Sequence, residues 1–146
     1  CSLQQNDSQN LNKDGMDITI VAYDKEKMQI HFAGANNSLV LLKDGQLTQT
    51  KGDKMPVAIY FEMRDFQQHT FDVARGDRYY LMSDGYEDQF GGPNGKKFMS
   101  KRLNELILQF ANIPMSKQEK LFSDAFEQWK GDIEQVDDVL LIGFEI

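Results

Sequence analysis

The stretch of sequence that most constrains the fold is YYLMSDGYEDQFGG, residues 79–92. In it, large apolar residues lead directly into Asp84-Gly85, and more acids follow. An Asp-Gly pair after a strand is usually a hairpin turn, but the next segment, YEDQFGGPNG, is too long and too acidic for a tight hairpin. We therefore predict that a buried strand fixes the Asp84 carboxylate at the edge of a sheet, where a rigid element can hold a ligand.

A second Asp-Gly pair, Asp44-Gly45, lies between Leu42 and Leu47, and residues of alternating polarity continue after it. Here the dipeptide supplies the positive φ angles that a type I′ hairpin turn requires. We predict a hairpin at this position, in contrast to Asp84-Gly85.

A further acidic pair, Asp137-Asp138, opens the closing strand VDDVLLIGFEI, residues 136–146. Two carboxylates at the ends of neighbouring strands repel each other unless a cation lies between them. The residues alone leave two interpretations open: a site for a hard metal ion, or strand-terminal acids that are simply solvated. Because adjacent strand residues point to opposite faces, Asp137 and Asp138 cannot both face one ion.

Composition narrows the classes of function. The 146 residues, 40% hydrophobic and 27% charged, fit one soluble globular domain. The net charge of −7, with no basic run to offset it, argues against nucleic acid and direct membrane contact. The only cysteine is Cys1, so any metal must take oxygen ligands rather than a zinc-type thiolate set.

Residues 1–15 are rich in Gln, Asn, Ser and Asp, and we predict a linker or the end of an upstream segment there. We expect that a chain starting at Cys1 has been cut from a longer one, in preference to the mature lipoprotein that would also start with cysteine. The domain itself is predicted to occupy residues 16–146.

The first part of this domain carries strand patterns. MDITIVAYD, residues 16–24, is apolar at nearly every position, as in a strand that is covered on both faces. In contrast, KMQIHFAG, residues 27–34, alternates apolar with polar side chains. Residues 69–85 predict two more strands, joined at residues 75–77.

After Phe98 the hydrophobic period becomes that of amphipathic helices. Four residues mark a first helix, and five mark a second: Leu103, Leu106, Ile107 and Phe110; then Leu121, Phe122, Ala125, Phe126 and Trp129. Ser116 and Glu119 predict a capping box at the start of the second helix, and Gly131 a cap at its end. With the closing strand, this order predicts an α+β fold in which helices cover an antiparallel sheet.

Four motifs, in this order along the chain, resemble a known family. GDRYYLMSDG (76–85) resembles the signature of the metal-dependent PPM, or protein phosphatase 2C-like, serine/threonine phosphatases, and QVDDVLLIGFEI (135–146) is similar to their closing strand. FAGANNSLVLL (32–42) and KGDKMP (51–56) resemble the bacterial branch typified by stage II sporulation protein E, SpoIIE. The resemblance runs from about Asp14 to the end of the chain.

The resemblance implies an antiparallel β-sandwich flanked by helices, with two Mn²⁺ or Mg²⁺ ions at one edge. Asp84 matches the second metal aspartate of the family and Asp137 the third, with Gly85, Asp88 and Asp138 as secondary candidates. A helix-start or surface role explains Asp88 better than coordination does, and Asp138 is expected to be solvated or bonded to backbone. In such enzymes the ions lower the pKa of a bridging water, which attacks a phosphoserine or phosphothreonine.

One departure from the family matters more than any match. The Asp-x-x-Gly-His-Gly segment that carries the first ligand is absent, and Asp14-Gly15 has no following His or Gly, so we reject Asp14 as that ligand. The chain therefore resembles the C-terminal part of a phosphatase domain. Ala58, where relatives usually have Gly after Met-Pro, says little about chemistry.

The remaining candidates have simpler explanations. His31 falls on the polar side of an alternating strand, and His69 is predicted in a polar loop, so neither is assigned an acid–base role. GGPNG, residues 91–95, lacks the strand and helix context of a phosphate cradle and is predicted to be a flap or turn. No catalytic side chain is assigned.

Two functions remain open. The first is a phosphatase domain of bacterial signalling that acts on a phosphorylated anti-sigma antagonist-like protein, with this fragment alone inactive. The second is a non-catalytic regulatory or binding module on the same fold, holding at most one ion. The resemblance also implies an upstream sensor or regulatory domain and a cytoplasmic location, including that of the cytoplasmic output domain of a membrane-anchored sensor. Uncovered sheet edges predict a homodimer or swapped oligomer.

Overall fold

The computed structural model describes residues 15–57 and 64–146. It divides into two compact units, which we call the first and second units: Cys1–Ser38 with Lys51–Asp72, and Leu39–Thr50 with Val73–Ile146. Of the predicted linker, only Gly15 is described. Ala58 and the rejected Asp14 lie outside the described residues. In the part of the chain that is described, no helix is long and apolar enough to cross a membrane.

The first unit contains an antiparallel sheet of three strands in the order β1-β2-β5. These strands are β1 (Ile18–Asp24), β2 (Gln29–Ala35) and β5 (His69–Asp72). The turn between β1 and β2 is held by Asp24 Oδ1, which accepts the backbone N–H groups of Glu26 and Lys27 at 3.1 and 3.0 Å. Ile30 and Phe32 are fully buried and alternate with partly exposed neighbours, as predicted.

Two predictions for this unit were wrong. Strand β1 was expected to be covered on both faces, but Ile20 and Tyr23 are 58% and 42% exposed. Among the described residues β1 is also an outer strand of its sheet. An apolar run allows such burial but needs a covering layer, and the described residues of this unit form no helix. His69 begins β5 rather than lying in a loop, and its ring stacks on Phe32 and Phe71 with centroids 5.8 and 6.3 Å away.

The second unit contains an antiparallel sheet of four strands in the order β4-β3-β6-β9. They are β3 (Leu39–Lys43), β4 (Gln46–Thr50), β6 (Arg78–Met82) and β9 (Leu141–Glu145). The predicted hairpin at Asp44-Gly45 is confirmed, because these two residues join β3 to β4 with φ angles of 50° and 74°. Strands β5 and β6, neighbours in sequence, belong to different sheets.

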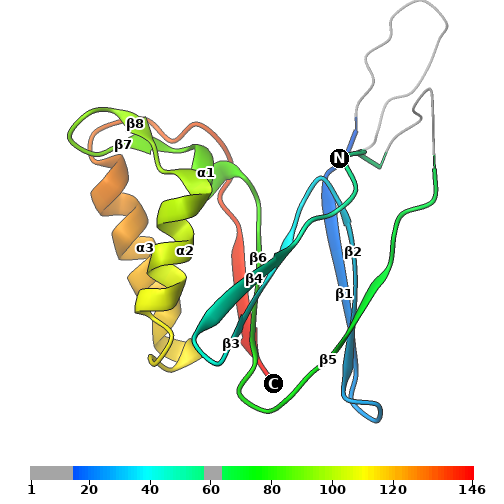
Figure 1. Cartoon of the computed structure of the whole chain (residues 1–146). Helices are drawn as coiled ribbons and strands as arrows, with labels where there is room; N and C mark the ends of the chain where they lie inside the picture. Colours follow the sequence, from blue (N-terminus) through cyan, green and yellow to red (C-terminus); the bar gives the residue numbers. More distant parts are fainter. Residues whose placement is uncertain (1–14, 58–63) are drawn as a thin grey trace, which may run out of the picture. The chain divides into compact units, whose positions relative to one another are not determined.

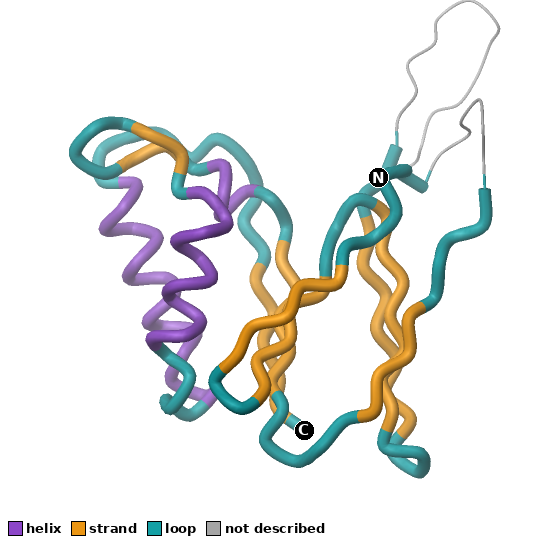
Figure 2. The backbone as a smooth tube through the Cα atoms, in the orientation of Figure 1, coloured by secondary structure: helices purple, strands orange, loops and turns teal. Residues whose placement is uncertain are grey.

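Helices α2 (Met99–Gln109) and α3 (Met115–Lys130) lie side by side on one face of this sheet, as the coils at the left of Figure 1 and the purple tubes of Figure 2 show. Between helices and sheet lies one apolar core: Val40, Leu42, Tyr80, Tyr86, Phe98, Leu103, Ile107, Phe110, Phe122 and Phe126. The predicted α+β class with antiparallel sheets is therefore confirmed. A sandwich further requires the two sheets to face each other, and that stays a prediction.

The predicted ends of α3 had mixed outcomes. Gly131 caps the C-terminus with φ 55°, and its N–H bonds to the Glu127 carbonyl at 2.9 Å, as expected. The capping box was wrong, because α3 begins at Met115 with Pro114 as its N-cap and has no side-chain cap. Ser116 therefore lies inside the first turn, where its hydroxyl cannot act as the N-cap. Pro114, with φ −53°, already directs the chain into the helix.

Candidate metal centre

Asp84 follows β6 and is the N-cap of the short helix α1 (Gly85–Asp88). Its backbone is right-handed helical, with φ −74°, and its side chain makes no capping hydrogen bond. The prediction that Asp84-Gly85 is not a hairpin turn is therefore confirmed. The carboxylate of Asp84 is exposed and does not cap the helix.

Strands β6 and β9 pair side by side, as the proposed carboxylate pair requires. Met82 is opposite Leu141, and the pairing continues as the Ser83 N–H bonds to the Leu140 carbonyl at 3.0 Å. The Ser83 hydroxyl donates to the Asp138 carbonyl at 2.9 Å and accepts the Leu140 N–H at 2.9 Å. Ser83, which directly precedes Asp84, thus holds the acidic 137–138 segment in place next to Asp84.

Gly85 is buried at the point where these two segments meet. A Cβ atom built on Gly85 would lie only 2.4 Å from the Asp138 carbonyl oxygen, which is far inside van der Waals contact. The φ angle of Gly85 is not positive, so the glycine is needed for close approach rather than for backbone freedom. The packing at this junction therefore requires a glycine, and the secondary role of Gly85 at a metal site stays a prediction.

Asp137 and Asp138 were expected to open the closing strand, but β9 begins at Leu141 and both acids lie in the irregular segment before it. Both residues are exposed. The argument that alternate strand residues face opposite ways therefore does not apply to them. Asp137 Oδ1 accepts the Asp138 N–H at 2.7 Å, and the Gln135 amide donates to the Asp137 carbonyl at 2.7 Å.

Two further acids follow Asp84 on α1. Asp88 lies in the single turn of this helix and its carboxylate pairs with Lys97 Nζ at 2.9 Å on the surface, in agreement with the predicted helix-start or surface role. Glu87 was not among the residues predicted for the site. Burial, and then the neighbouring charges of Asp88 and Asp84, raise the pKa of the Glu87 carboxyl. Its position three residues after Asp84, within one helical turn, was the available signal.

The donor chemistry of this site fits a hard cation, but the donor set is short. Carboxylate oxygens are the ligands that Mg²⁺ and Mn²⁺ prefer, and the backbones of Asp84 and of the 137–138 segment lie at the same end of the paired strands β6 and β9. Across residues 15–57 and 64–146, no group of three or more His, Cys, Asp or Glu side chains is arranged to hold a metal. A tightly held ion would therefore need ligands in addition to these.

The hairpin after α1 confirms the predicted turn at GGPNG. Strands β7 (Phe90–Gly91) and β8 (Lys96–Lys97) pair around it, and Gly92 and Gly95 have φ angles of 65° and 56°. Gly91 and Gly92 pack directly against Trp129, with no room for a Cβ atom. The segment is a turn seated on α3.

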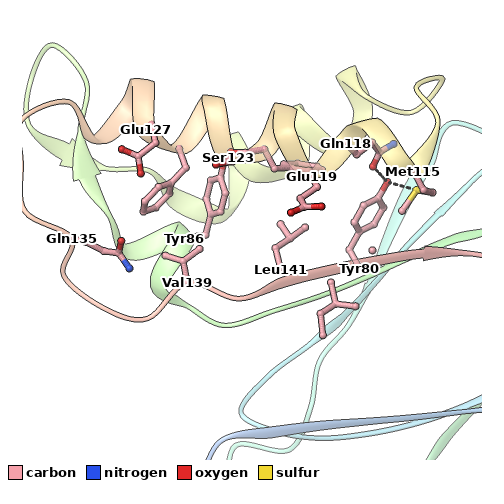
Figure 3. Close-up of a pocket in the computed structure, with 14 residues that line it drawn as sticks. Tyr80, Tyr86, Met115, Gln118, Glu119, Ser123, Glu127, Gln135, Val139 and Leu141 are labelled. Carbon is pink, nitrogen blue, oxygen red and sulfur yellow. Dashed lines mark hydrogen bonds between the residues drawn. The ribbon is translucent and has the colours of Figure 1, made fainter.

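A groove of about 580 Å³ lies between α3 and β9 (Figure 3). Figure 3 shows Glu119, Ser123 and Glu127 along α3 on one side and Val139 and Leu141 on the other. Neither Asp84 nor Asp137 lines this groove, so it is separate from the acidic site.

The two histidines contact their own sheet. His31 Nδ1 lies 3.0 Å from Thr70 Oγ1 and 3.3 Å from Gln68 Nε2. Together with the stacking of His69 on Phe32 and Phe71, these contacts are those of structural residues.

Comparison with known protein families identifies the family of this chain. The model of the stage II sporulation protein E (SpoIIE) family matches residues 2–146. The chain belongs to the SpoIIE family. None of the curated proteins matches it in sequence.

Solved structures place this SpoIIE-family chain in the PP2C phosphatase fold. The SiaA-PP2C domain of Pseudomonas aeruginosa is 29% identical, with a TM-score of 0.82 over 89% of this chain and 51% of that chain. The SpoIIE phosphatase domain of Bacillus subtilis is 15% identical, with a TM-score of 0.62 over 89% and 56%. The catalytic domain of the phosphatase PstP, in complex with two manganese ions, is 20% identical, with a TM-score of 0.59 over 88% and 57%.

These matches confirm the resemblance to PPM-type phosphatases and the α+β fold. They also show that the chain spans about half the length of the SiaA domain that it matches. The family is one of metal-dependent hydrolases, and the manganese in the PstP structure is a property of that protein.

Proposed function

We propose that this chain is part of a Mn²⁺- or Mg²⁺-dependent protein serine/threonine phosphatase domain of bacterial signalling. The observation that carries the proposal is the pairing of β6 with β9 and its extension through Ser83. That pairing puts Asp84 and the Asp137 segment at the same edge of the sheet, in a chain of the SpoIIE family.

Asp84 and Asp137 are the residues we assign to the metal ions. Gly85 allows the two segments to touch, and the exposed Asp138 and the Lys97-paired Asp88 are assigned outer positions. Bound ions of this kind lower the pKa of a water molecule and offset negative charge on a phosphoryl group. The task of this chain is to hold carboxylates in place for them and to keep the acidic edge accessible.

We propose that the rest of the ligand set, including the first aspartate of the family, is supplied by sequence outside this chain. This is consistent with a chain that covers 51% of the SiaA domain and with the absence of a three-acid cluster in the described residues. The chain alone should then bind metal weakly and show no turnover, because too few carboxylates are present to dehydrate the ion.

The substrate we propose is a phosphoserine or phosphothreonine protein that resembles a phosphorylated anti-sigma antagonist. An upstream sensor or regulatory domain and a cytoplasmic location, free or beneath a membrane anchor, are part of the same proposal. The exposed edge strand β1, with Ile20 58% exposed, supports the further proposal that the isolated chain forms a homodimer or swapped oligomer, detectable by light scattering.

The alternative is a non-catalytic regulatory module on the same fold that holds at most one ion. The absence of a three-acid cluster in the described residues favours this alternative for the chain taken alone. A protein of this kind would bind its partner without metal-dependent turnover.

The deciding experiment compares two substitutions in the chain joined to the upstream half of the domain. Asp84→Asn should lower Mn²⁺-dependent hydrolysis of a phosphoserine protein by about 1,000-fold, because a metal that contributes several kcal/mol to the transition state is lost. Asp44→Asn is the matched control and should be neutral, since Asn-Gly forms the same turn. Full turnover in Asp84→Asn would refute the assignment, and no turnover in the unsubstituted protein would favour the regulatory alternative.

A further inference from the structure

The segment that leads into Asp137 is attached to the end of α1 by one buried side chain, that of Gln89. Gln89 is fully buried. Its Nε2 group donates to the carbonyls of Phe90 and Glu134, both at 3.0 Å. Its Oε1 atom accepts the N–H of Val136 at 3.2 Å. The amide therefore bonds to the backbone of Glu134 and Val136, on either side of Gln135. Val136 directly precedes Asp137.

The backbone of Gln89 is itself fixed from two other elements. Its carbonyl accepts the indole N–H of Trp129 on α3 at 3.1 Å and the N–H of Phe98 at 2.9 Å. Trp129 in turn packs edge-on against Phe98, with ring centroids 5.3 Å apart, and beneath the Arg102 guanidinium at 4.4 Å. The Gln89 amide thus projects from a rigid support rather than from a free loop.

The other end of the acidic segment is held by Ser83, which contacts the Asp138 carbonyl and the Leu140 N–H. Ser83 directly precedes Asp84, and Gln89 directly follows α1. The short stretch 83–89 therefore carries one proposed ligand, Asp84. It also carries Ser83 and Gln89, the two residues that hold the segment containing the other proposed ligand, Asp137. Asp137, although exposed, lies between two fixed points.

We propose that Gln89 is a positioning residue for the metal site, holding Asp137 at the distance from Asp84 that a shared cation requires. This inference rests on the proposed function, and goes beyond it in naming what sets the ligand geometry. Two unmetallated carboxylates repel each other. If the segment were held only at Ser83, Asp137 could move away from Asp84. Metal binding would then have to order the segment again, and this cost would lower the metal affinity. Outer contacts of this kind change metal affinity by about 10–100-fold in other proteins.

Among the described residues, a second glutamine amide is buried, and it offers a matched control. Gln118 is 2% exposed, donates to the carbonyls of Phe110 and Ile113 at 2.8 and 3.0 Å, and accepts the Tyr80 hydroxyl at 2.9 Å. It fixes the connection between α2 and α3, and its hydrogen bonds go to Tyr80, Phe110 and Ile113 rather than to residues 134–140. Gln89→Leu and Gln118→Leu therefore each leave three hydrogen-bond partners without an amide.

The experiment measures two quantities in the full-length protein. The first is the Mn²⁺ dissociation constant, from calorimetric titration. The second is amide hydrogen exchange of the segment 134–140 without metal, from mass spectrometry. Gln89→Leu should raise the dissociation constant about 10–100-fold and speed exchange in this segment several-fold. Gln118→Leu should change neither quantity. Gln89→Asn, which keeps the amide on a shorter side chain, should act in the same direction and replaces Gln89→Leu if that variant does not fold.

The outcomes separate this proposal from the proposed function. If Asp84→Asn weakens Mn²⁺ binding but the Gln89 variants bind like the unsubstituted protein, the positioning role is wrong and the metal assignment stands. If Gln118→Leu weakens binding as much as Gln89→Leu, the effect is general destabilisation, which also overturns the role. If Asp84→Asn binds Mn²⁺ with undiminished affinity, the metal assignment fails and this role of Gln89 fails with it.

Discussion

The two Asp-Gly pairs of the second unit use the same dipeptide for different physical reasons. Asp44 and Gly45 both have positive φ angles, and nothing lies within 4 Å of a Cβ built on Gly45. Asp84 is right-handed helical, and a Cβ on Gly85 would meet the Asp138 carbonyl at 2.4 Å. The first pair reverses the chain, whereas the second brings two segments together. The dipeptide alone cannot distinguish these uses, but the residues that follow it can.

The acids of the two pairs differ accordingly. In a type I′ turn the aspartate is chosen because its backbone tolerates the left-handed region. At the end of β6 the backbone has no such demand, and the helix that follows is not capped by the Asp84 side chain. An aspartate that neither the turn nor the cap requires is available to bind a cation.

The largest effect on stability should come from adding a methyl group at the two glycines. Gly85→Ala should lower the free energy of unfolding by about 2–3 kcal/mol, because the new Cβ collides with backbone that cannot move away easily. Gly45→Ala should cost about 1 kcal/mol, the cost of a left-handed residue with a side chain in open space. Urea unfolding of both variants measures the difference. Equal losses would show that close approach at Gly85 is not what the glycine provides.

A smaller effect on the free energy of unfolding, which depends on pH, should come from Glu87 next to Asp84. Burial, then Asp88, then Asp84 raise the pKa of Glu87 above its ordinary value. Ionising Glu87 therefore opposes folding: the cost is absent below the ordinary pKa of about 4.3 and is complete above the folded-state pKa. Without metal, Glu87→Gln should stabilise the protein at pH 7 by about 0.5 kcal/mol, a typical surface-substitution effect, and should have no effect at pH 3.

The same comparison extends to Asp84→Asn, which removes one of the charges next to Glu87. In metal-free buffer it should leave the melting temperature unchanged or slightly raised, while Asp44→Asn should leave it unchanged. A clear loss of stability in Asp84→Asn at neutral pH would mean that Asp84 stabilises the fold, and would contradict the prediction that its charge destabilises the metal-free protein.

Local patterns predicted most of the second unit. The Asp44-Gly45 hairpin and the two helices follow from turn chemistry and from the 3.6-residue period. The pairing of β6 with β9 was assumed in the carboxylate argument and does not follow from a local pattern. The cap of α3 was misplaced because Pro114 and Ser116 both mark helix starts, and only the backbone shows which one is used.

The contacts that define the candidate site were beyond sequence reasoning. The Gln89 amide bonds to backbone atoms 45 and 47 residues away, and Ser83 to atoms 55 and 57 residues away. Neither contact leaves a periodic signal, and a lone Gln in an acidic stretch is expected on the surface. Likewise, an apolar run could not reveal that side chains of β1 are exposed, because the covering layer is not encoded in the strand itself.

The most direct test of the metal assignment is paramagnetic broadening by Mn²⁺ in the nuclear magnetic resonance spectrum of this chain, since broadening reports even weak binding. If Asp84 and Asp137 bind the ion, backbone amide signals of residues 84–86 and 137–139 broaden first. Those of residues 44–46 should persist. Asp84→Asn should abolish the selective broadening, and Asp44→Asn should preserve it. Equal broadening at the two Asp-Gly pairs, or selective broadening that survives Asp84→Asn, would contradict the claim that Asp84 and Asp137 form a cation site.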